Sequence, residues 1–418
     1  MTNTSNTPKP VIFIGAADAI CGEAIRFFVK ATDVHVVLAD ADEDALRRVA
    51  AKLPGRNITT RKVDIFNPNE LRSTIAGAAL VIQGAQPYYR TSTVVLTACI
   101  DAKVPYLDYS DDVHSTQESL NLHERAKKEG ISCYINCGAS PGMTNLFVVE
   151  IPQQLDTVDS LDICWLVSEE GGDLGREVLV HLMHITGGPC LTWDNGKAAI
   201  HENWIETSYA PFVHPESVTL PRRLPNVNRI RTSGALNPAP FNGFARGLGA
   251  AVNSGTLSMD VAVDFLQNMQ RKSSQGWSDM FGVIIAQFRG GDITLNDLYQ
   301  LDKHGVSSLK PWNLALWGMI DQVRKGECTS GERAPHRSGL LVRGVGTRNG
   351  QPAVVIRRTP TDEKDPFLGE AWRLRLEHAS RGQPGVYCPE DWAEPEAFFT
   401  SMQKLGCPQD QIVESVNE

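Results

Sequence analysis

The sequence predicts an α/β fold whose first domain is a doubly wound parallel sheet. Three observations lead to this class. Short apolar, β-branched runs alternate with stretches of helical periodicity from Val11 to Asn136. The connections between them are short and rich in Gly, Pro and Asp. The first apolar run ends at a glycine that opens a helix, which is the arrangement of a βαβ nucleotide-binding unit.

These patterns predict the elements in chain order. Residues 11–14 form a continuous apolar run, typical of a strand covered on both faces. Ala24, Ile25, Phe28 and Val29 then recur at helical spacing. Further strands are expected at 34–39, 58–63, 80–83, 105–109 and 131–136, and helices at 42–53, 67–77, 92–102 and 114–129. Right-handed crossovers would bring the carboxyl ends of the strands to one edge, where ligands bind.

The composition narrows the possible function classes. A net charge of −9 argues against the basic surface that nucleic acid requires. No apolar stretch approaches the roughly 20 residues that span a bilayer. The polar residues 1–10 predict a short disordered leader, because they lack the apolar centre of a signal peptide. Nine scattered cysteines without a CxxC pair fit a reducing compartment, so we expect a cytoplasmic protein.

The turn after the first strand predicts a dinucleotide site. Only the first glycine of the GxGxxG pattern is present, and Asp18 puts a carboxylate where pyrophosphate would meet the helix N-terminus. The alternative role of Asp18 is to cap that helix. Asp40 ends the second strand near the offset of a ribose-binding carboxylate. NAD is therefore the expected cofactor, and NADP is less favoured because its 2′-phosphate would meet like charge, although Arg47 or Arg48 could offset this. The turn residues are Gly15, Ala16, Ala17, Asp18, Ala19 and Ile20.

Loops at the other strand ends extend the predicted cofactor site. Pro141-Gly142 suits a backbone that passes close to a flat ring, because glycine is free in φ and proline fixes the approach. The residues expected to contact the cofactor from these loops are Asp64, Ile65, Gly84, Ala85, Gln86, Pro87, Pro141 and Gly142.

Three stretches carry a family resemblance. They are VIQGAQPYYRTSTVVLTACIDAKVPYLDYSDD at 81–112, CGASPGMTNL at 137–146 and GVYCPEDWAEPEAFFTSMQKLG at 385–406. In this order they resemble the saccharopine dehydrogenase-like oxidoreductases, which bind NAD(P) in a Rossmann-type domain. The resemblance implies hydride transfer at a C–N bond of a small amino-acid-like or polyamine-like substrate. It also implies that the Pro87-Tyr88 turn borders the nicotinamide ribose, and that the protein is a homodimer.

The expected domain organisation follows from the same reasoning. Residues 11–145 are predicted to form the Rossmann domain, and 146–380 an α+β substrate and dimerisation domain with strands such as 161–167, 339–342 and 353–357. The Pro-rich residues 211–225 are expected to be a surface loop. The resemblance implies that residues 381–418 return to the first domain.

Two groups at strand ends are candidates for substrate chemistry. Tyr89 and Arg90 follow a strand end, and Arg90 could pair with a substrate carboxylate or lie on the surface of the next helix. Asp108 and Asp111 belong to a crowded acidic loop, in which repulsion and burial raise the pKa of a carboxyl group and so prepare an acid or base. The alternative is that Asp111 or Asp112 caps the next helix.

The densest polar cluster of the second domain lies at residues 175–197. His181 and His184 are three apart on one helical face, so one of them could donate a proton or bind substrate, or both could pack structurally. No third ligand accompanies them, so no metal is expected. Arg176 and Trp193 are candidates to contact an anionic or planar substrate.

The predicted function is an NAD(P)-dependent oxidoreductase whose small substrate carries a carboxylate or an amine. Two alternatives stay open. One is a redox-neutral enzyme that holds NAD tightly and transfers an aminoalkyl group or cleaves a C–C bond. The other is a non-catalytic binding protein in which Asp18 and Cys21 have disabled the phosphate turn.

Overall fold

A computed structural model describes residues 9–54, 57–168, 175–187, 189–201, 210–211, 214–237, 248–249, 252–253, 255, 257–273, 339–359, 382–404 and 410–415. The chain divides into two compact units, residues 1–146 with 365–408 and residues 147–364 with 409–418. Most of the predicted leader lies outside the described residues.

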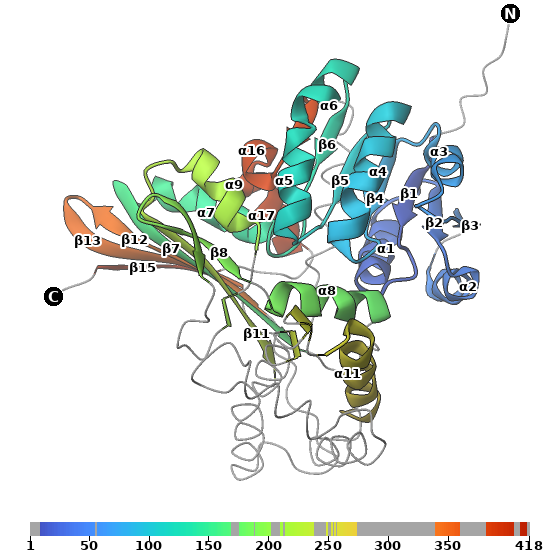
Figure 1. Cartoon of the computed structure of the whole chain (residues 1–418). Helices are drawn as coiled ribbons and strands as arrows, with labels where there is room; N and C mark the ends of the chain where they lie inside the picture. Colours follow the sequence, from blue (N-terminus) through green and yellow to red (C-terminus); the bar gives the residue numbers. More distant parts are fainter. Residues whose placement is uncertain are drawn as a thin grey trace, which may run out of the picture. The chain divides into compact units, whose positions relative to one another are not determined.

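The first unit is built on a seven-stranded parallel sheet in the order β14-β6-β5-β4-β1-β2-β3 (Figure 1). The chain fills the sheet outward from β1 in one direction and then from β4 in the other, so the topological switch point lies between β1 and β4. The strands are β1 (Val11–Ile14), β2 (Val36–Asp40), β3 (Ile58–Lys62), β4 (Leu80–Gln83), β5 (Tyr106–Asp108), β6 (Ser132–Tyr134) and β14 (Gly385–Tyr387).

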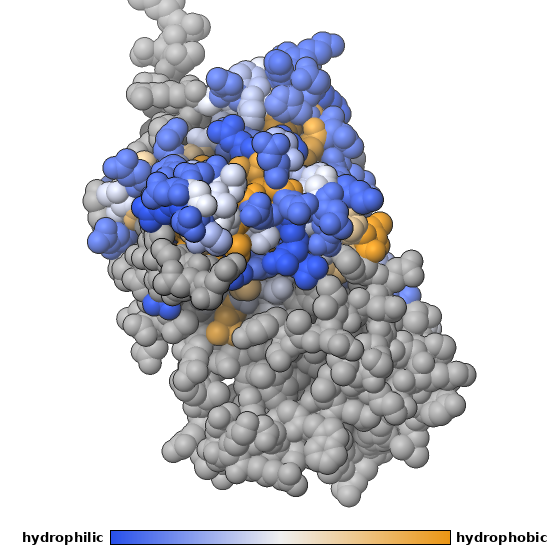
Figure 2. All heavy atoms as spheres, turned by 90° about the vertical axis from the view of Figure 1, so that its left-hand side faces the viewer, coloured by the Kyte–Doolittle hydropathy of each residue, from blue (hydrophilic) through white to orange (hydrophobic). Residues whose placement is uncertain are grey.

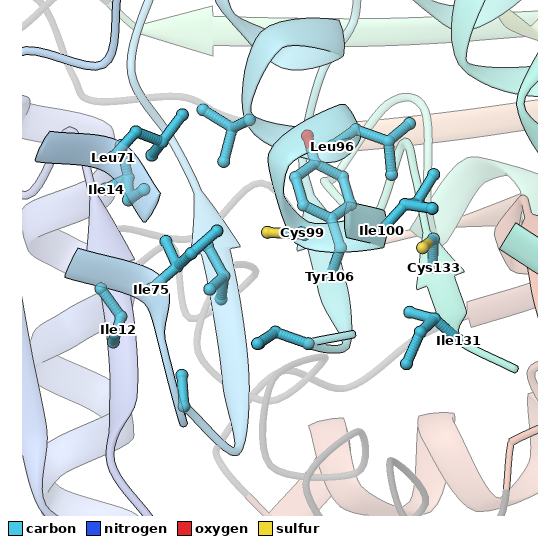
Figure 3. Packing of buried hydrophobic residues seen from close by; sticks show 14 of the residues in the cluster. Ile12, Ile14, Leu71, Ile75, Leu96, Cys99, Ile100, Tyr106, Ile131 and Cys133 are labelled. Carbon is cyan, nitrogen blue, oxygen red and sulfur yellow. The ribbon is translucent and has the colours of Figure 1, made fainter. Parts of the chain in front are cut away.

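Helices cover both faces of this sheet. Val11 and Phe13 pack in one apolar cluster with Phe28 of α1, while Ile12 and Ile14 belong to a second cluster with residues of α3 and α4 (Figure 3). Burial on both faces explains the continuous apolar run of β1. The predicted α/β class with a doubly wound sheet is confirmed. The helices of this unit are α1 (Ala19–Ala31), α2 (Glu43–Lys52), α3 (Pro68–Ile75), α4 (Tyr88–Ala102), α5 (Val113–Asn121), α6 (His123–Glu129), α16 (Pro389–Trp392) and α17 (Pro395–Lys404).

Two helix boundaries differ from the prediction. The helix expected at 92–102 begins at Tyr88, because Pro87 presets a suitable φ of −76° and its carbonyl accepts a hydrogen bond from Thr91 Oγ1. The helix expected at 114–129 is divided at Leu122 into α5 and α6. His123, the first residue of α6, accepts a hydrogen bond at Nδ1 from the Val386 backbone N–H of β14, a contact that local periodicity does not reveal.

The second unit contains a mixed eight-stranded sheet. Its main order is β15-β13-β12-β7-β11-β8-β9, with β10 paired to β11, and β7 and β11 are parallel. The strands are β7 (Thr157–Ser168), β8 (Cys190–Asp194), β9 (Lys197–His201), β10 (Ala210–Pro211), β11 (Arg229–Asn237), β12 (Gly339–Arg348), β13 (Gln351–Arg358) and β15 (Asp410–Ser415). Among the described residues, the other helices are α7 (Met143–Glu150), the 3-10 helix η1 (Ile151–Gln153), α8 (Arg176–Gly187), α9 (Glu216–Arg223) and α11 (Met259–Ser273).

The prediction of a surface loop at 211–225 is wrong. This stretch contains α9, in which Glu216, Ser217, Thr219, Leu220 and Pro221 are buried. Of the four prolines that suggested a loop, Pro211 belongs to β10, Pro215 directly precedes α9, Pro221 lies inside the helix and Pro225 follows it. The apolar contacts of α9 in the folded unit outweigh its weak local helix signal.

The C-terminal stretch is shared between the two sheets. β14 extends the first sheet by pairing with β6, a strand that the sequence did not predict. The later strand β15 instead pairs antiparallel with β13 of the second sheet. The expectation that residues 381–418 return together to the first domain is therefore wrong for 410–415.

Among the described residues, no helix is both long and apolar enough to cross a membrane. On the face drawn in Figure 2, the described residues are mainly hydrophilic, and the hydrophobic ones lie in separate small patches.

Candidate functional site

The turn after β1 lies at the switch point of the first sheet and packs tightly against the turn after β4. Gly15 has a φ of +76°, and a Cβ atom there would lie 2.3 Å from the Ala85 amide nitrogen. Only glycine fits this conformation and this approach. Ala16 is fully buried, and the Asp18 carbonyl accepts the first helical hydrogen bond of α1 from Gly22 N. The N-terminus of α1 is thereby aimed at the edge where a phosphate group would bind.

Asp40 joins the end of β2 to this turn. Its Oδ2 accepts a hydrogen bond from the Ala17 N–H at 3.1 Å, and its Oδ1 accepts one from the Asp42 N–H at 3.1 Å. The carboxylate therefore lies beside the glycine turn, where a ribose-binding acid is expected in this fold. Arg47 forms ion pairs with Glu43 and Asp44 of α2, so its charge is largely matched locally.

The loop after β3 presents an exposed aromatic ring. Asp64 Oδ1 accepts a hydrogen bond from the Phe66 N–H at 2.9 Å, and Ile65 packs against the core. Phe66 is 55% exposed, and the Arg90 guanidinium carbon lies 6.0 Å from its ring centroid. Arg90 thus occupies the exposed first turn of α4, which is one of the two places the sequence left open for it.

The loop after β4 is braced by a buried glutamine. Gln83 donates from Nε2 to the Ala85 carbonyl at 2.9 Å and to Thr91 Oγ1 at 3.0 Å. Thr91 Oγ1 donates in turn to the Ala85 carbonyl. Gln86 and Pro87, at the end of this loop, are also buried. The backbone of the loop is therefore held in one position at the switch point.

Two buried tyrosines stand behind these turns. The rings of Tyr88 and Tyr109 meet edge to face with centroids 6.2 Å apart. A Cβ atom on Gly84 would lie 2.1 Å from the Tyr109 hydroxyl, so glycine is required here by packing alone. Burial raises the pKa of Tyr88, and the nearby charges of Asp111 and then Asp18 raise it further. Both tyrosines are neutral hydrogen-bonding groups at physiological pH.

Asp108 is a fully buried hydrogen-bond acceptor at the end of β5. It accepts hydrogen bonds from the Asn136 N–H at 2.9 Å, the Tyr106 hydroxyl at 2.7 Å and the Ser110 N–H at 3.2 Å. Burial raises the pKa of Asp108 to about 6, although the three hydrogen bonds act in the opposite direction and Asp111 adds a small rise. This is the predicted pKa shift of a crowded, desolvated carboxyl group.

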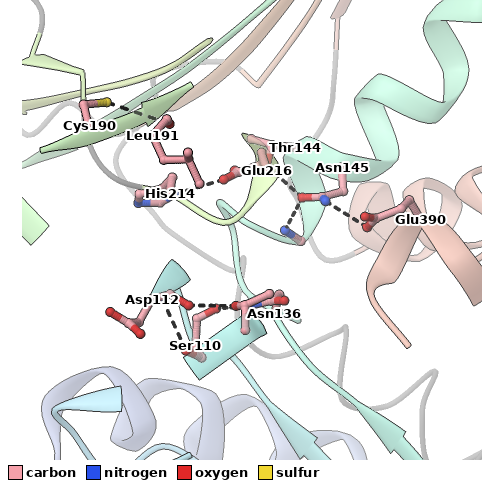
Figure 4. A network of polar contacts seen from close by, with 12 residues as sticks. Ser110, Asp112, Asn136, Thr144, Asn145, Cys190, Leu191, His214, Glu216 and Glu390 are labelled. Carbon is pink, nitrogen blue, oxygen red and sulfur yellow. Dashed lines mark hydrogen bonds and ion pairs between the residues drawn. The ribbon is translucent and has the colours of Figure 1, made fainter. Parts of the chain in front are cut away.

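The two other acids of this loop, Asp111 and Asp112, differ in role: one caps a helix and the other is accessible. Asp112 accepts a hydrogen bond from the Ser115 N–H at 2.6 Å and caps α5, so the capping alternative is confirmed for this residue. Figure 4 shows Asp112 and Ser110 beside Asn136, whose Nδ2 donates to the Ser110 carbonyl at 2.7 Å. Asp111 is half-buried and is the more accessible of the two candidate acids.

The turn after β6 is fixed by the side chain of Asn145. Gly142 has a φ of +133°, and a Cβ atom there would lie 1.9 Å from the Gly138 carbonyl oxygen. Asn145 Oδ1 accepts a hydrogen bond from the Gly142 N–H, and Asn145 Nδ2 donates to Glu390 Oε2 at 2.8 Å (Figure 4). Asn145 therefore supports the predicted Pro141-Gly142 turn from behind and ties it to α16.

The candidates of the second unit have structural partners. Arg176 forms ion pairs with Asp260 and Asp264 of α11 and so links α8 to that helix. His181 is 3% exposed, and its ring centroid lies 6.5 Å from that of His184. Trp193 donates from Nε1 to the Val227 carbonyl at 2.9 Å. The described residues contain no group of three or more His, Cys, Asp and Glu side chains that could hold a metal ion.

Sequence reasoning missed a row of charges across the second sheet. Asp162 of β7 pairs with Arg229 of β11 at 3.1 Å and with Arg343 of β12 at 3.3 Å, while Arg231 of β11 pairs with Asp194 of β8 at 3.4 Å. Three arginines against two carboxylates leave a net positive charge on a half-exposed face, which could hold an anion. Alternation of these residues with apolar ones along the strands was the available signal.

A buried pair in the same unit was also missed. His214 Nδ1 lies 3.1 Å from Glu216 Oε2, and both side chains are almost completely buried. The His214 ring lies 5.7 Å from the Trp165 ring. The sequence did not indicate that His214 and Glu216 are buried, because the prolines of residues 211–225 predicted a surface loop.

Three features together define a Rossmann-type nucleotide-binding domain. The strand order changes direction between β1 and β4, a glycine turn lies at this switch point, and a carboxylate ends β2. Residues 11–134 match the family model of the saccharopine dehydrogenase NADP binding domain. The resemblance to saccharopine dehydrogenase-like proteins is thereby confirmed for this domain, and a nicotinamide dinucleotide is supported as its cofactor. The family model favours NADP, in contrast to the NAD expected from Asp40.

Solved structures extend the likeness in fold to the whole chain. Apo histidine-tagged saccharopine dehydrogenase (L-Glu forming) from Saccharomyces cerevisiae has a TM-score of 0.57 and 14% identity, over 97% of this chain and 100% of that one. Pen from Bacillus thuringiensis has a TM-score of 0.28 and 13% identity, over 31% of this chain and 51% of that one. A short chain dehydrogenase/reductase family oxidoreductase from Burkholderia thailandensis has a TM-score of 0.25 and 15% identity, over 31% and 68%. At these identities the first match establishes the fold alone, and the other two add nothing to it.

Proposed function

We propose that this protein is an NAD(P)-dependent oxidoreductase that transfers hydride at a C–N bond of a small substrate carrying a carboxylate or an amine. The observation that carries the proposal is the close contact of the Gly15 and Ala85 turns beside Asp40. Glycine at position 15 lets the turn after β1 pack against the Ala85 backbone, and the N-terminus of α1 that follows this turn is the usual binding place of a pyrophosphate in this fold. When bound, the nicotinamide would accept or supply the hydride.

The residues around this turn have separate proposed roles. The turn from Gly15 to Ile20, at the N-terminus of α1, would bind the pyrophosphate, and Asp40 would bind the adenosine ribose. Phe66 and Arg90 offer a flat apolar and cationic surface to the purine. The remaining predicted contact residues, from Gly84 to Pro87 and at Pro141-Gly142, would shape the nicotinamide side by their backbone.

Asp111 is the proposed acid or base, and Asp108 is proposed as a positioning residue. The half-buried carboxyl group of Asp111 can exchange protons with a substrate amine, whereas Asp108 is fully occupied by its hydrogen bonds. Tyr89, His181 and Arg176 stay weaker candidates.

The dinucleotide proposal is tested by glycine variants. In Gly15→Ala the added methyl group overlaps the Ala85 backbone, so affinity for NADH and NADPH should fall at least tenfold in a fluorescence titration. Gly22→Ala is the matched control, since its Cβ meets no atom within 4 Å and the affinity should stay within twofold. Circular dichroism checks that both variants fold. A wild-type protein without saturable binding of either nucleotide at millimolar concentration would reject the proposal.

The proton-transfer proposal is tested at Asp111. Asp111→Asn keeps the shape of the side chain but removes its ability to exchange a proton. With a substrate identified by screening, turnover should therefore fall about 100-fold, which is the usual scale of acid–base catalysis. Affinity for NADPH should not change. Unaltered turnover would remove Asp111 from the mechanism.

A further inference from the structure

The first unit contains a cavity beside the proposed dinucleotide site, with which it shares Gly142. It has a volume of about 450 Å³ and lies beyond the ends of β6 and β14, between the 138–142 turn and helices α16 and α17. This is within the size range of small-molecule sites. Neither Gly15 nor Asp40, the residues that define the nucleotide turn, belongs to its wall.

Aromatic rings from separate parts of the chain form one wall of the cavity. Tyr134 ends β6 and is paired in register with Tyr387 of β14. The ring centroid of Tyr134 lies 6.3 Å from that of Tyr387 and 5.0 Å from that of Trp392, with the latter pair at an interplanar angle of 65°. Phe398 of α17 also lines the cavity. Tyr387 and Trp392 are only partly buried, so their rings contribute aromatic surface to this wall, and the π face of an aromatic ring attracts a cation.

The charged side chains in the cavity wall are acidic. Asp391 and Glu394 line the cavity, and no Lys, Arg or His is among the lining residues that the structure describes. The Asp391 carboxylate is held by a hydrogen bond at Oδ2 from the Cys388 N–H at 3.0 Å. Burial raises the pKa of Tyr387, and the charges of Asp391 and then Glu124 raise it further, as a locally negative environment requires.

The cavity and the proposed cofactor site share the 138–142 turn. Gly138 and Gly142 line the cavity. On its other side, a Cβ atom on Gly138 would lie 3.5 Å from Tyr109 Cβ, which belongs to the buried cluster behind the cofactor turns. A ligand in the cavity would therefore contact the backbone that is proposed to border the nicotinamide.

We propose that this aromatic and acidic cavity binds an organic ammonium ion, a protonated amine or quaternary ammonium group on a short aliphatic chain. The rings would contact the cationic head and the carboxylates would supply the opposing charge. The inference does not depend on the redox reaction, because it rests on the cavity of the first unit alone.

The test compares cations with neutral molecules of the same shape. Titration calorimetry on the full chain would use choline against 3,3-dimethylbutan-1-ol, and 1,4-diaminobutane against butane-1,4-diol. At least one cation should bind saturably and at least tenfold more tightly than its neutral partner. Absence of saturable binding of both cations at 50 mM, on the order of the weakest useful site, would overturn the proposal, as would equal affinity for each cation and its neutral partner.

Variants locate the binding. Trp392→Leu should weaken cation binding at least tenfold, and Glu394→Gln about threefold. Glu396→Gln is the matched control, because Glu396 is an exposed acid two residues after Glu394 but outside the cavity wall, and binding should be unchanged. The affinity of Trp392→Leu for NADPH should stay within twofold of the wild-type affinity. Failure of the cavity proposal can therefore be distinguished from failure of the proposed function. Cation binding that is insensitive to both cavity variants would reject this site.

Discussion

Asp40 carries the question of cofactor choice at the level of a single residue. Its carboxylate lies against the Ala17 N–H of the glycine turn, so a 2′-phosphate on the adjacent ribose would approach a negative charge. The family match nevertheless favours NADP. The preference between NAD and NADP then depends on two effects at the 2′-phosphate, which are repulsion by Asp40 and attraction by neighbouring cations such as Arg48.

We predict that Asp40→Asn raises the affinity for NADPH relative to NADH about tenfold, equivalent to roughly 1.4 kcal/mol. The reason is that the variant removes repulsion felt only by the 2′-phosphate. Parallel fluorescence titrations measure the ratio. Asp33→Asn is the control, since this exposed acid precedes β2 at the opposite end of the strand. If the ratio of NADPH affinity to NADH affinity is the same in Asp40→Asn as in wild type, the 2′-phosphate does not bind near Asp40.

Asp108 makes a second prediction at this scale, concerning stability and pH. Its folded-state pKa of about 6 is above that of an unfolded aspartate, so the folded protein binds the proton more tightly. The stabilisation from this protonation is fully present below about pH 4 and is lost as the pH rises through 6. Asp108→Asn cannot titrate and keeps an oxygen that can accept hydrogen bonds.

We therefore expect wild type to lose about 1 kcal/mol of unfolding free energy relative to Asp108→Asn between pH 5 and pH 7.5. Urea unfolding of both proteins at the two pH values measures this difference. Asp101→Asn, which removes an exposed carboxylate, controls for the loss of one negative charge. A difference of opposite sign would mean that the hydrogen bonds outweigh burial at Asp108.

At the scale of elements, periodicity was sufficient where one element packs on a large apolar face. β1 and β4 were predicted with their observed ends, because both are buried on two sides and bounded by turns. Elements that depend on distant partners were less predictable. The division of α5 from α6 reflects contacts of His123 with β14, and α9 is helical because its side chains are buried in the second unit.

The same distinction applies to the elements of the site. The glycine turn and the strand-end acids could be found from sequence because fold topology requires them at those positions. The roles of Asp108, Asp112 and Asn145 could not be separated from sequence, since capping, bracing and catalysis use the same residue types. Arg176 appeared available for substrate until its two aspartate partners on α11 were known.

At the scale of the whole molecule, the C-terminal stretch completes both sheets. Val386 and Cys388 are fully buried in the first unit, and Phe399 and Met402 of α17 are nearly so. Loss of each large apolar side chain from a core costs roughly 1.5–3 kcal/mol, so the first unit depends strongly on residues distant in sequence.

We predict that a chain ending at residue 381 loses NADPH binding and cooperative unfolding of the first unit, because β6 then lacks its neighbour β14. A chain ending at residue 404 removes β15 but keeps β14, α16 and α17, and should still bind NADPH. Calorimetry and nucleotide titration of both forms make the comparison. Full nucleotide binding by the shorter chain would show that the Rossmann sheet is stable without its seventh strand.

The sequence by itself determined the α/β class, the glycine turn after the first strand and the carboxylate at the end of the second strand. These depend on local periodicity and on glycine stereochemistry, both of which are written in adjacent residues. Only the tertiary structure decided which acids are buried, which arginines already have partners, and that Tyr134, Tyr387 and Trp392 surround one cavity. The reason is that burial and charge pairing are set by residues that meet across long sequence separations, such as Asn145 and Glu390.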